Sequence, residues 1–367
     1  MKEERQVEKV AILGAGNGGI TAAADLGHRG FEVRLYELPR FSQNLDPVIK
    51  RGGILLKNKN KEDFVKPHLV TSDIQKAIDG AEVIMLTIPA LAVEEFAKVC
   101  APYLKDNQIV FINSAGAMSS ARFINVIRSM GIDTDIKIGE SSSLTYGTRV
   151  INGSEVELYL SAKKLLFSAF PSRNTPEVLE KCKCLYNSLV PASNIWETTL
   201  NNGNPETHPG PCLLNAGRIE YSGGEFYLYR EGITEGVSRV IKAISKERKA
   251  LCDALSVKYI PTEKRLAEIG YCEPLEKLHE QYRRSEVFGP IKGPLSLTSR
   301  YFVEDISMGL VLWSSLGKAL GIATPIIDSI IMLGGSLIEK DYWLEGLTLE
   351  KLGLADMDCN GLIEYVS

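Results

Sequence analysis

A short buried strand that leads directly into a glycine-rich turn and a helix constrains this 367-residue chain more than any other feature. The strand is the apolar run at residues 10–13, as expected of a strand covered on both faces of a parallel sheet. Gly14, Gly16 and Gly19 follow it with the spacing G-x-G-x-x-G. Glycines so spaced allow a tight turn, close approach of the backbone to a pyrophosphate, and close packing of helix on strand. The stretch predicts a dinucleotide-binding βαβ unit.

The second strand of this unit is expected at residues 32–36 and ends at Glu37. An acid about 20 residues beyond the glycines binds the adenosine ribose hydroxyls. Because a carboxylate there repels a 2′-phosphate, we expect NAD(H) as the preferred cofactor, while the flanking Arg34 and Arg40 leave NADP(H) open. The predicted cofactor-binding residues belong to the glycine turn and to the ends of two strands: Gly14, Gly16, Asn17, Gly18, Gly19, Glu37 and Pro89.

Further apolar strands alternate with helical stretches through the N-terminal half, which predicts a doubly wound, mostly parallel sheet. The strands are expected at 83–88, 109–112, 136–138 and 165–167, and the helices at 93–104 and 122–130. Ligands of such sheets bind beyond the carboxyl ends of the strands. An amphipathic helix over 176–189 is followed by a break at 191–194, so we expect a Rossmann domain at 1–193 and a second domain at 194–367.

The second domain is expected to be all-helical, because strand patterns vanish beyond residue 194. Pro209 or Pro211 can start a helix there, which places His208 at its first turn. The positive partial charge of a helix N-terminus disfavours an imidazolium ion. A neutral imidazole can accept a proton from a substrate at physiological pH. The alternative is that His208 only packs against neighbouring side chains or caps a helix.

A second polar cluster in this domain places Arg300, Glu304 and Asp305 among apolar residues. Charges in such a setting are usually paired or functional. An aspartate within reach of His208 would fix the tautomer of the imidazole, and an arginine nearby offers a fork for a substrate carboxylate. A structural salt bridge between Arg300 and Glu304, at helical spacing, is the alternative.

Composition and charge exclude several other classes of protein. The chain is 44% hydrophobic and 24% charged, with a formal net charge of -4, so it lacks the basic footprint of a nucleic-acid-binding protein. No apolar run is long enough to span a membrane, and the charged residues 1–6 do not resemble a secretory leader, so we expect a cytoplasmic protein. The seven scattered cysteines match no metal-site spacing, and we predict no metal.

Several motifs together resemble the opine dehydrogenases, the family of octopine, nopaline and N-(1-carboxyethyl)-amino-acid dehydrogenases. The resemblance covers nearly the whole chain. The motifs that carry it are LGAGNGG at 13–19, GESSS at 139–143, HPGPCLLNA at 208–216, YREGIT at 229–234, GPI at 289–291, SRYFVED at 299–305 and LEKLGL at 349–354.

This resemblance implies a Rossmann domain followed by a helical substrate domain, and an NAD(P)H-dependent oxidoreductase. In its reaction the amine of an amino acid condenses with a 2-oxo acid such as pyruvate, and the imine is reduced to a secondary-amine dicarboxylic acid. Matched residue by residue, His208 is the catalytic histidine and Asp305 the carboxylate that orients it. Arg300 would bind the carboxylate of the 2-oxo acid, and Glu140 would contact the amino acid.

Two alternatives stay open. One is a reductase of 2-oxo or hydroxy acids of the ketopantoate reductase or 6-phosphogluconate dehydrogenase type, although residues 211–220 lack the lysine that such enzymes use. The other is an NAD-sensing module without catalysis. The sequence leaves the amino acid, the direction of the reaction and the assembly open, with a homodimer as one expected state.

Overall fold

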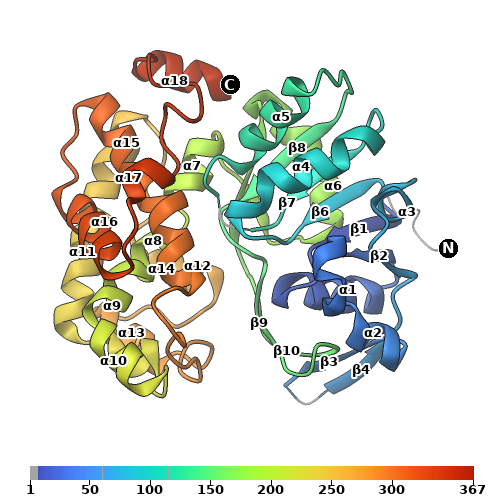
Figure 1. The fold of residues 1–367 in the computed structure, drawn as a ribbon, viewed down its shortest axis with the longest axis horizontal. Helices are drawn as coiled ribbons and strands as arrows, with labels where there is room; N and C mark the ends of the chain where they lie inside the picture. Colours follow the sequence, from blue (N-terminus) through green and yellow to red (C-terminus); the bar gives the residue numbers. More distant parts are fainter. Residues whose placement is uncertain (1–6, 60, 115) are drawn as a thin grey trace. The chain divides into compact units, whose positions relative to one another are not determined.

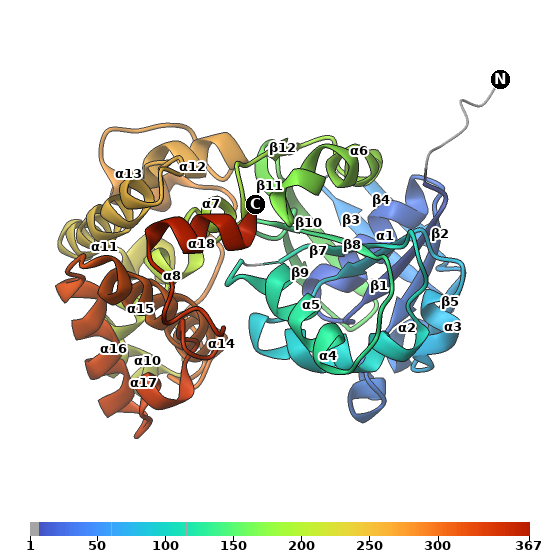
Figure 2. The ribbon, with the colours of Figure 1, turned by 90° about the horizontal axis from the view of Figure 1, so that it is seen from above.

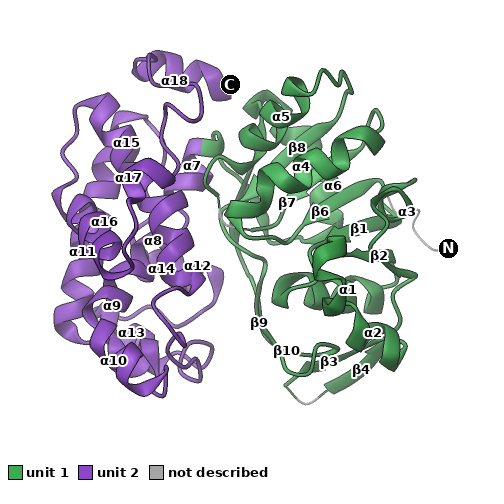
Figure 3. Ribbon diagram, viewed as in Figure 1, with its two compact units in different colours: residues 1–195 green, residues 196–367 purple. Residues whose placement is uncertain are grey.

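The computed structural model describes residues 7–59, 61–114 and 116–367, and the chain forms two compact units (Figure 3). Unit 1 comprises residues 1–195 and unit 2 residues 196–367. This division lies two residues beyond the boundary expected from the sequence. The charged residues 1–6, on which the expectation of no leader rests, lie outside the described residues.

Unit 1 is built on an eight-stranded sheet in the order β12-β11-β8-β7-β6-β1-β2-β5. All neighbouring strands pair in parallel except β11 and β8. The predicted doubly wound, mostly parallel sheet is therefore confirmed, and β1 lies where the strand order reverses. Its strands are β1 (Lys9–Leu13), β2 (Glu32–Tyr36), β5 (Leu69–Thr71), β6 (Val83–Leu86), β7 (Ile109–Ile112), β8 (Lys137–Ser141), β11 (Leu165–Phe170) and β12 (Leu189–Pro191).

Helices cover both faces of this sheet (Figures 1 and 2). On one face lie α1 (Asn17–His28) and α6 (Thr175–Leu185), and on the other lie α3 (Ile74–Ile78), α4 (Val93–Cys100) and α5 (Ser119–Ser129). Because both faces are covered, every residue of the central strands β6 and β7 is buried. Shorter helical segments are η1 (Pro39–Asn44), α2 (Asp46–Arg51), η2 (Ala90–Ala92), η3 (Ala101–Tyr103) and η4 (Ser172–Asn174).

A second, four-stranded sheet in unit 1 was not expected from the sequence. Its order is β4-β3-β10-β9, with β3 at Ile54–Asn58, β4 at Lys61–Val65, β9 at Tyr146–Val150 and β10 at Glu155–Ser161. It packs against α1, where Thr21 and Thr148 share a hydrogen bond of 2.7 Å. The predicted helix over 176–189 was too long, because α6 ends at Leu185 and β12 begins at Leu189.

Unit 2 is helical within the described residues, with one isolated β-bridge between Tyr227 and Lys292. Thr234 caps the longest of its helices by accepting a hydrogen bond from Val237, as a threonine at this position commonly does. The helices are α7 (Ile195–Leu200), α8 (Asn204–Thr207), α9 (Pro209–Leu214), α10 (Ala216–Ser222), α11 (Glu235–Ala254), α12 (Thr262–Ile269), α13 (Leu278–Arg284), α14 (Arg300–Glu304), α15 (Val311–Leu320), α16 (Pro325–Leu337), α17 (Tyr342–Glu345) and α18 (Cys359–Val366).

Two segments of unit 2 have π-helical geometry: η5 (Leu228–Gly232) and η6 (Asp305–Leu310). The second joins α14 to α15, so the chain stays helical from Arg300 to Leu320. A π-helical turn is rare, and it occurs mostly as a single bulge that re-aims side chains, frequently at a functional site. Both segments supply side chains to the site described next.

Candidate active site

His208 lies at the junction between α8 and α9, where it ends the first helix and begins the second. Pro209 takes the first position of α9, one of the two prolines expected to start that helix. The helix is short, because it ends at Leu214 and α10 begins at Ala216. The His208 side chain is 10% exposed, so the chemistry of its ring depends on the partners around it.

Asp305 is the partner of one ring nitrogen, although it lies 97 residues further along the chain. The distance from His208 Nδ1 to Asp305 Oδ2 is 2.7 Å, and the Asp305 side chain is 4% exposed. An ionised carboxylate only accepts hydrogen bonds, so Nδ1 carries the hydrogen and Nε2 of the neutral ring carries the lone pair. The structure thus brings together the two residues that the sequence predicted as a catalytic pair.

Two tyrosines complete the surroundings of the imidazole, and neither was predicted from the sequence to contact it. The Tyr229 hydroxyl lies 2.9 Å from His208 Nε2. The Tyr301 ring stacks on the imidazole, with centroids 4.1 Å apart and an interplanar angle of 21°. Both residues belong to motifs that resemble the family, but nothing in their spacing indicates a contact with His208.

Arg300 lies one turn before Asp305, at the start of α14. Its Nε is 3.2 Å from Glu304 Oε2, so the salt bridge left open as an alternative does form. The Arg300 side chain is nevertheless 57% exposed, whereas the Glu304 side chain is 3% exposed. A guanidinium has five N–H donors, so pairing with one carboxylate leaves donors of this group for an anionic ligand.

A buried ion cluster holds the chain segment that precedes His208. Glu206 accepts hydrogen bonds from Arg248 Nε at 2.7 Å and from Arg265 at 2.9 Å, and the Arg248 and Glu206 side chains are fully buried. Burial alone would raise the pKa of Glu206, but the two guanidinium charges lower it to about 2. Removing one partner of a buried pair costs about 3–5 kcal/mol, because the other charge stays buried and unpaired. The cluster therefore fixes the backbone from which His208 projects.

The glycine turn of unit 1 has the geometry that its sequence predicts. Gly14 has φ +100°, a conformation that favours glycine. A Cβ added to Gly19 would lie 1.7 Å from the Gly14 carbonyl oxygen, so α1 packs on the turn as closely as backbone allows. A Cβ added to Gly16 would meet nothing within 4 Å. The open space is therefore at Gly16, the glycine that lets backbone approach a pyrophosphate in this motif.

Glu37 lies at the end of β2, beside this turn. One carboxylate oxygen accepts a hydrogen bond from the Ala15 backbone N–H and the other from the Leu38 backbone N–H, each at 2.9 Å. Oε2, which binds Ala15, also accepts a long hydrogen bond of 3.4 Å from Asn44 Nδ2. Oε1, which binds Leu38, keeps a second lone pair for a ribose hydroxyl. The open space at Gly16, the start of α1 and this carboxylate together fit a dinucleotide.

The structure shows the surroundings of three other predicted residues, Asn17, Gly18 and Pro89. Asn17 Oδ1 accepts a hydrogen bond of 2.8 Å from the Val150 backbone, which ties α1 to β9. A Cβ on Gly18 would lie 2.9 Å from the Leu144 side chain. Pro89 is exposed just beyond β6. Their contact with a cofactor stays a prediction.

Glu140 is fully buried on β8, and its carboxylate accepts hydrogen bonds from the backbone N–H of Ser120 at 2.8 Å and from the Ser120 hydroxyl at 2.7 Å. Ser120 is the second residue of α5, so this carboxylate satisfies a free N–H at the start of that helix. Its predicted contact with an amino-acid substrate is not indicated by these bonds and stays a prediction.

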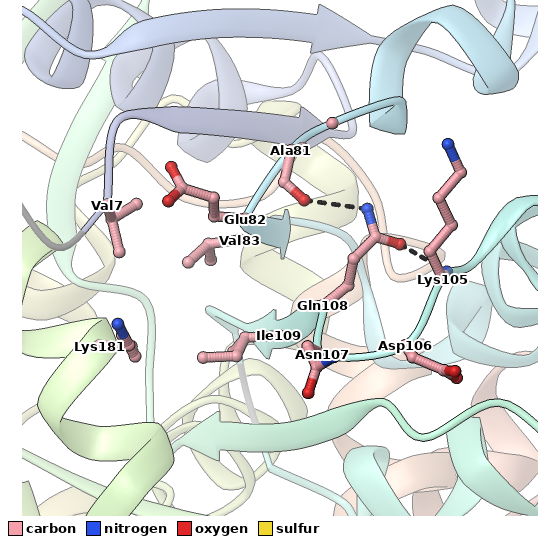
Figure 4. Close-up of a pocket in the computed structure, with 11 residues that line it drawn as sticks. Val7, Ala81, Glu82, Val83, Lys105, Asp106, Asn107, Gln108, Ile109 and Lys181 are labelled. Carbon is pink, nitrogen blue, oxygen red and sulfur yellow. Dashed lines mark hydrogen bonds between the residues drawn. The ribbon is translucent and has the colours of Figure 1, made fainter.

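A cavity of about 330 Å³ in unit 1 lies beside the amino ends of β6 and β7 (Figure 4). The glycine turn lies at the opposite edge of the sheet, at the carboxyl end of β1. Gln108 closes one side by donating hydrogen bonds to the carbonyls of Ile78 and Ala81. Glu82 accepts hydrogen bonds from backbone N–H groups of Glu8 and Lys9. The side chains of Gln108 and Glu82 are thus engaged by backbone groups of the protein, and ligands of open α/β sheets bind at the carboxyl ends of the strands instead.

Within the described residues, no group of three histidine, cysteine or carboxylate side chains is placed to hold a metal ion. In the same part of the chain, no helix combines the length and apolar character needed to cross a bilayer.

Comparison with known proteins identifies the two units. Residues 191–338 match a family described as NAD/NADP octopine/nopaline dehydrogenase, alpha-helical domain. Residues 9–139 match the NAD-dependent glycerol-3-phosphate dehydrogenase N-terminus. The fold is shared with solved structures at low identity: octopine dehydrogenase with NADH and agmatine has a TM-score of 0.79 at 20% identity, with 97% of this chain and 98% of that chain covered.

Relatives in sequence extend over almost the whole chain. Octopine dehydrogenase of Pecten maximus is 25% identical, with 92% of each chain covered. The opine dehydrogenase of Arthrobacter sp. (strain 1C) is 32% identical over 352 residues, which cover 96% of this chain and 97% of the relative. With that identity over both units, the chain belongs to the opine dehydrogenase family.

Proposed function

We propose that His208 is the acid–base group of this enzyme, that Asp305 orients it, and that Arg300 binds the carboxylate of a 2-oxo acid. The chain is an NAD(P)H-dependent oxidoreductase that acts on CH–NH groups, and its reaction joins the amine of an amino acid to a 2-oxo acid by reductive condensation. Structures of octopine dehydrogenase with NADH and L-arginine, and with NADH and pyruvate, support these two substrate classes for this chain.

The observation that carries the proposal is the 2.7 Å contact between His208 Nδ1 and Asp305 Oδ2. It fixes one tautomer and leaves the basic nitrogen as Nε2. The buried carboxylate also stabilises the imidazolium that forms when Nε2 takes a proton. The pair therefore meets the geometric requirement for a histidine that gains and loses a proton in each turnover.

Reductive condensation needs proton transfer at two atoms. The amine adds to the carbonyl carbon of the 2-oxo acid, and the carbonyl oxygen gains two protons in all and leaves as water. The amine nitrogen loses protons as the imine forms. A histidine can donate a proton to the oxygen and accept one from the nitrogen, because its neutral and charged forms both exist near neutral pH. Bound NADH supplies the hydride that reduces the imine carbon.

For the cofactor, the structure offers the turn at Gly14 to Gly19 and the Glu37 carboxylate. The pyrophosphate would approach the backbone at Gly16, and the start of α1 would face its charge. The carboxylate of Glu37 would bind the adenosine ribose. The sequence favours NAD(H), because this carboxylate would repel a 2′-phosphate. Arg40 leaves NADP(H) open, since its side chain is 60% exposed, although it pairs with Glu95 at 2.5 Å.

The substrate role of Arg300 gives the first test. An Arg300→Lys variant keeps the positive charge but loses the fork that binds a carboxylate through two parallel hydrogen bonds. A hydrogen bond to a charged group contributes about 1.5–3 kcal/mol, so we expect the KM for pyruvate to rise by about 10- to 100-fold. The KM for NADH should change little. Steady-state kinetics at fixed amino acid and NADH measure both values.

Arg284 supplies a matched control. It also pairs with a glutamate four residues away, Glu280, at 3.2 Å, and its side chain is 69% exposed. We expect Arg284→Lys to keep the wild-type KM for pyruvate. If Arg300→Lys behaves in the same way as this control, Arg300 does not bind the 2-oxo acid.

The hydroxy-acid reductase alternative is not favoured. A ketopantoate reductase from Ralstonia eutropha has the same architecture, with a TM-score of 0.61 at 21% identity, which shows a related fold alone. The segment 211–220, where such enzymes have a catalytic lysine, contains no lysine here. A homodimer and a cytoplasmic location stay predictions from the sequence.

A further inference from the structure

Both ring nitrogens of His208 already have a protein partner: Asp305 at Nδ1, 2.7 Å away, and Tyr229 at Nε2, 2.9 Å away. An imidazole has no third nitrogen. A proton can therefore enter or leave Nε2 only beside the oxygen of the Tyr229 hydroxyl.

We infer that Tyr229 is a positioning residue for His208: its hydroxyl holds the ring from the Nε2 side and changes from donor to acceptor when His208 gains a proton. This inference rests on the proposed acid–base function of His208, and it adds a second residue that controls the same ring.

The direction of the hydrogen bond follows from Asp305. Because the carboxylate accepts from Nδ1–H, Nε2 of the neutral ring is an acceptor, and the Tyr229 hydroxyl must donate to it. Burial raises the pKa of Tyr229 well above its usual value, with a further contribution from the neighbouring Tyr301, so the phenol keeps its proton. When Nε2 is protonated it becomes the donor, the same oxygen accepts, and the hydroxyl hydrogen rotates about the C–O bond away from the ring. The bond thus persists in both protonation states.

Packing keeps Tyr229 in this position. Its side chain is buried, and its ring stacks on Phe288 at 4.5 Å with an angle of 29°. Tyr301 covers the imidazole ring at 4.1 Å. The two side chains that bind the imidazole nitrogens come from the two π-helical segments, η5 for Tyr229 and η6 for Asp305. Because π-helical turns are rare and frequent at functional sites, their presence at both partners of this ring indicates that the fold positions both contacts of the imidazole.

The helices packed around His208 carry other ionisable groups, and the test must account for them. They are Glu206 on α8, already paired with Arg248 of α11 and with Arg265 of α12; Cys212 on α9; Tyr282 on α13; Arg300, Tyr301 and Glu304 on α14; and, on α16, Asp328, which binds Ser314 and Thr324. Removing the Tyr229 hydroxyl leaves all of these side chains in place, but Tyr301 loses a hydrogen-bond partner, so its contribution is part of the measured effect.

A Tyr229→Phe variant separates this role from packing, because the ring remains and only the hydroxyl is lost. A hydrogen bond from a charged donor contributes more than one between neutral groups. Losing the hydroxyl should therefore cost the imidazolium more than the neutral ring, and the midpoint of the His208 titration should fall by about half to one pH unit. Loosening the ring should also lower kcat by about tenfold or more.

The test is a pH titration of the full chain labelled with ¹⁵N-histidine, followed by NMR. The chain has four histidines, and the His208 resonances are those absent from a His208→Ala sample. The wild-type spectrum should show a neutral ring with hydrogen on Nδ1 and a hydrogen-bonded Nε2. Activity is measured in parallel as kcat against pH, with pyruvate, NADH and the most active amino acid of a panel.

Tyr282→Phe is the matched control, because it removes a buried hydroxyl from the same aromatic cluster. That hydroxyl binds Thr207 at 3.0 Å and does not reach the imidazole. We expect Tyr282→Phe to keep the wild-type midpoint of His208 and Tyr229→Phe to lower it, with similar melting temperatures. Equal midpoints and equal kcat in the two variants would overturn the inference, as would a wild-type spectrum with hydrogen on Nε2. If His208→Ala retains turnover, the proposed function fails, and the spectra still decide the hydrogen bond.

Discussion

A His208→Ala variant is expected to lose about 10²- to 10⁴-fold in kcat, the usual contribution of general acid–base catalysis. The loss is expected because the variant removes the imidazole that the buried Asp305 carboxylate holds in one tautomer. NADH binding, measured by fluorescence titration, should stay within about threefold of wild type, since the residues predicted to hold the dinucleotide belong to unit 1. An Asp305→Asn variant should lose activity for the related reason that its amide favours the wrong tautomer.

His68→Ala controls for loss of a histidine as such. His68 is also close to a carboxylate, with Nε2 3.8 Å from Glu32 Oε1, but its side chain is 60% exposed. We expect this variant to keep wild-type kcat. Normal turnover in His208→Ala, measured in the same assay, would remove His208 from the mechanism.

The second large effect is expected at the glycine turn, where two glycines should respond differently to the same substitution. Gly16→Ala places a methyl group where nothing lies within 4 Å, so the protein should fold normally. That methyl group occupies the space through which a pyrophosphate approaches the backbone. We expect NADH affinity to fall by at least about tenfold, equal to about 1.4 kcal/mol. Fluorescence titration and thermal unfolding measure the two properties.

Gly19→Ala should instead reduce stability, because its methyl group would lie 1.7 Å from the Gly14 carbonyl oxygen. Overpacking costs about 1–3 kcal/mol or more, and the melting temperature should fall by several degrees. Gly217→Ala in α10 is the control, since its methyl group also meets nothing within 4 Å and no ligand is expected there. Unchanged NADH affinity in Gly16→Ala would show that the pyrophosphate does not bind at this turn.

Much of the fold could be predicted, because its main elements have strong local patterns. The strand at 10–13, the glycine turn and the buried strands β6 and β7 are apolar runs with clear ends. The four-stranded sheet was missed because β4, β9 and β10 lack such runs and only β3 begins with three apolar residues. The strand β4, Lys61–Val65, contains three charged residues, and only Val65 in it is buried. Its pairing depends on β3 and β10 rather than on its own sequence.

The site was predicted less completely, because its contacts join distant segments. Asp305 was assigned to His208 from a family resemblance and not from spacing, since 97 residues separate them. Tyr229 was missed because it is one of 14 tyrosines, and because a π-helical turn breaks the 3.6-residue period on which helix prediction depends. Glu140 was also assigned from the family resemblance; its carboxylate accepts hydrogen bonds from Ser120 at the start of α5, and its contact with an amino-acid substrate stays a prediction.

The most direct measurement of the central claim is NADH oxidation by the wild-type enzyme with pyruvate alone and with pyruvate plus each member of an amino-acid panel. Reductive condensation requires both carbon substrates. We therefore expect negligible oxidation with pyruvate alone, rapid oxidation with at least one amino acid, and a product whose mass equals the two substrates minus water plus two hydrogens. Equally rapid oxidation without any amine would contradict the account and indicate a simple 2-oxo acid reductase.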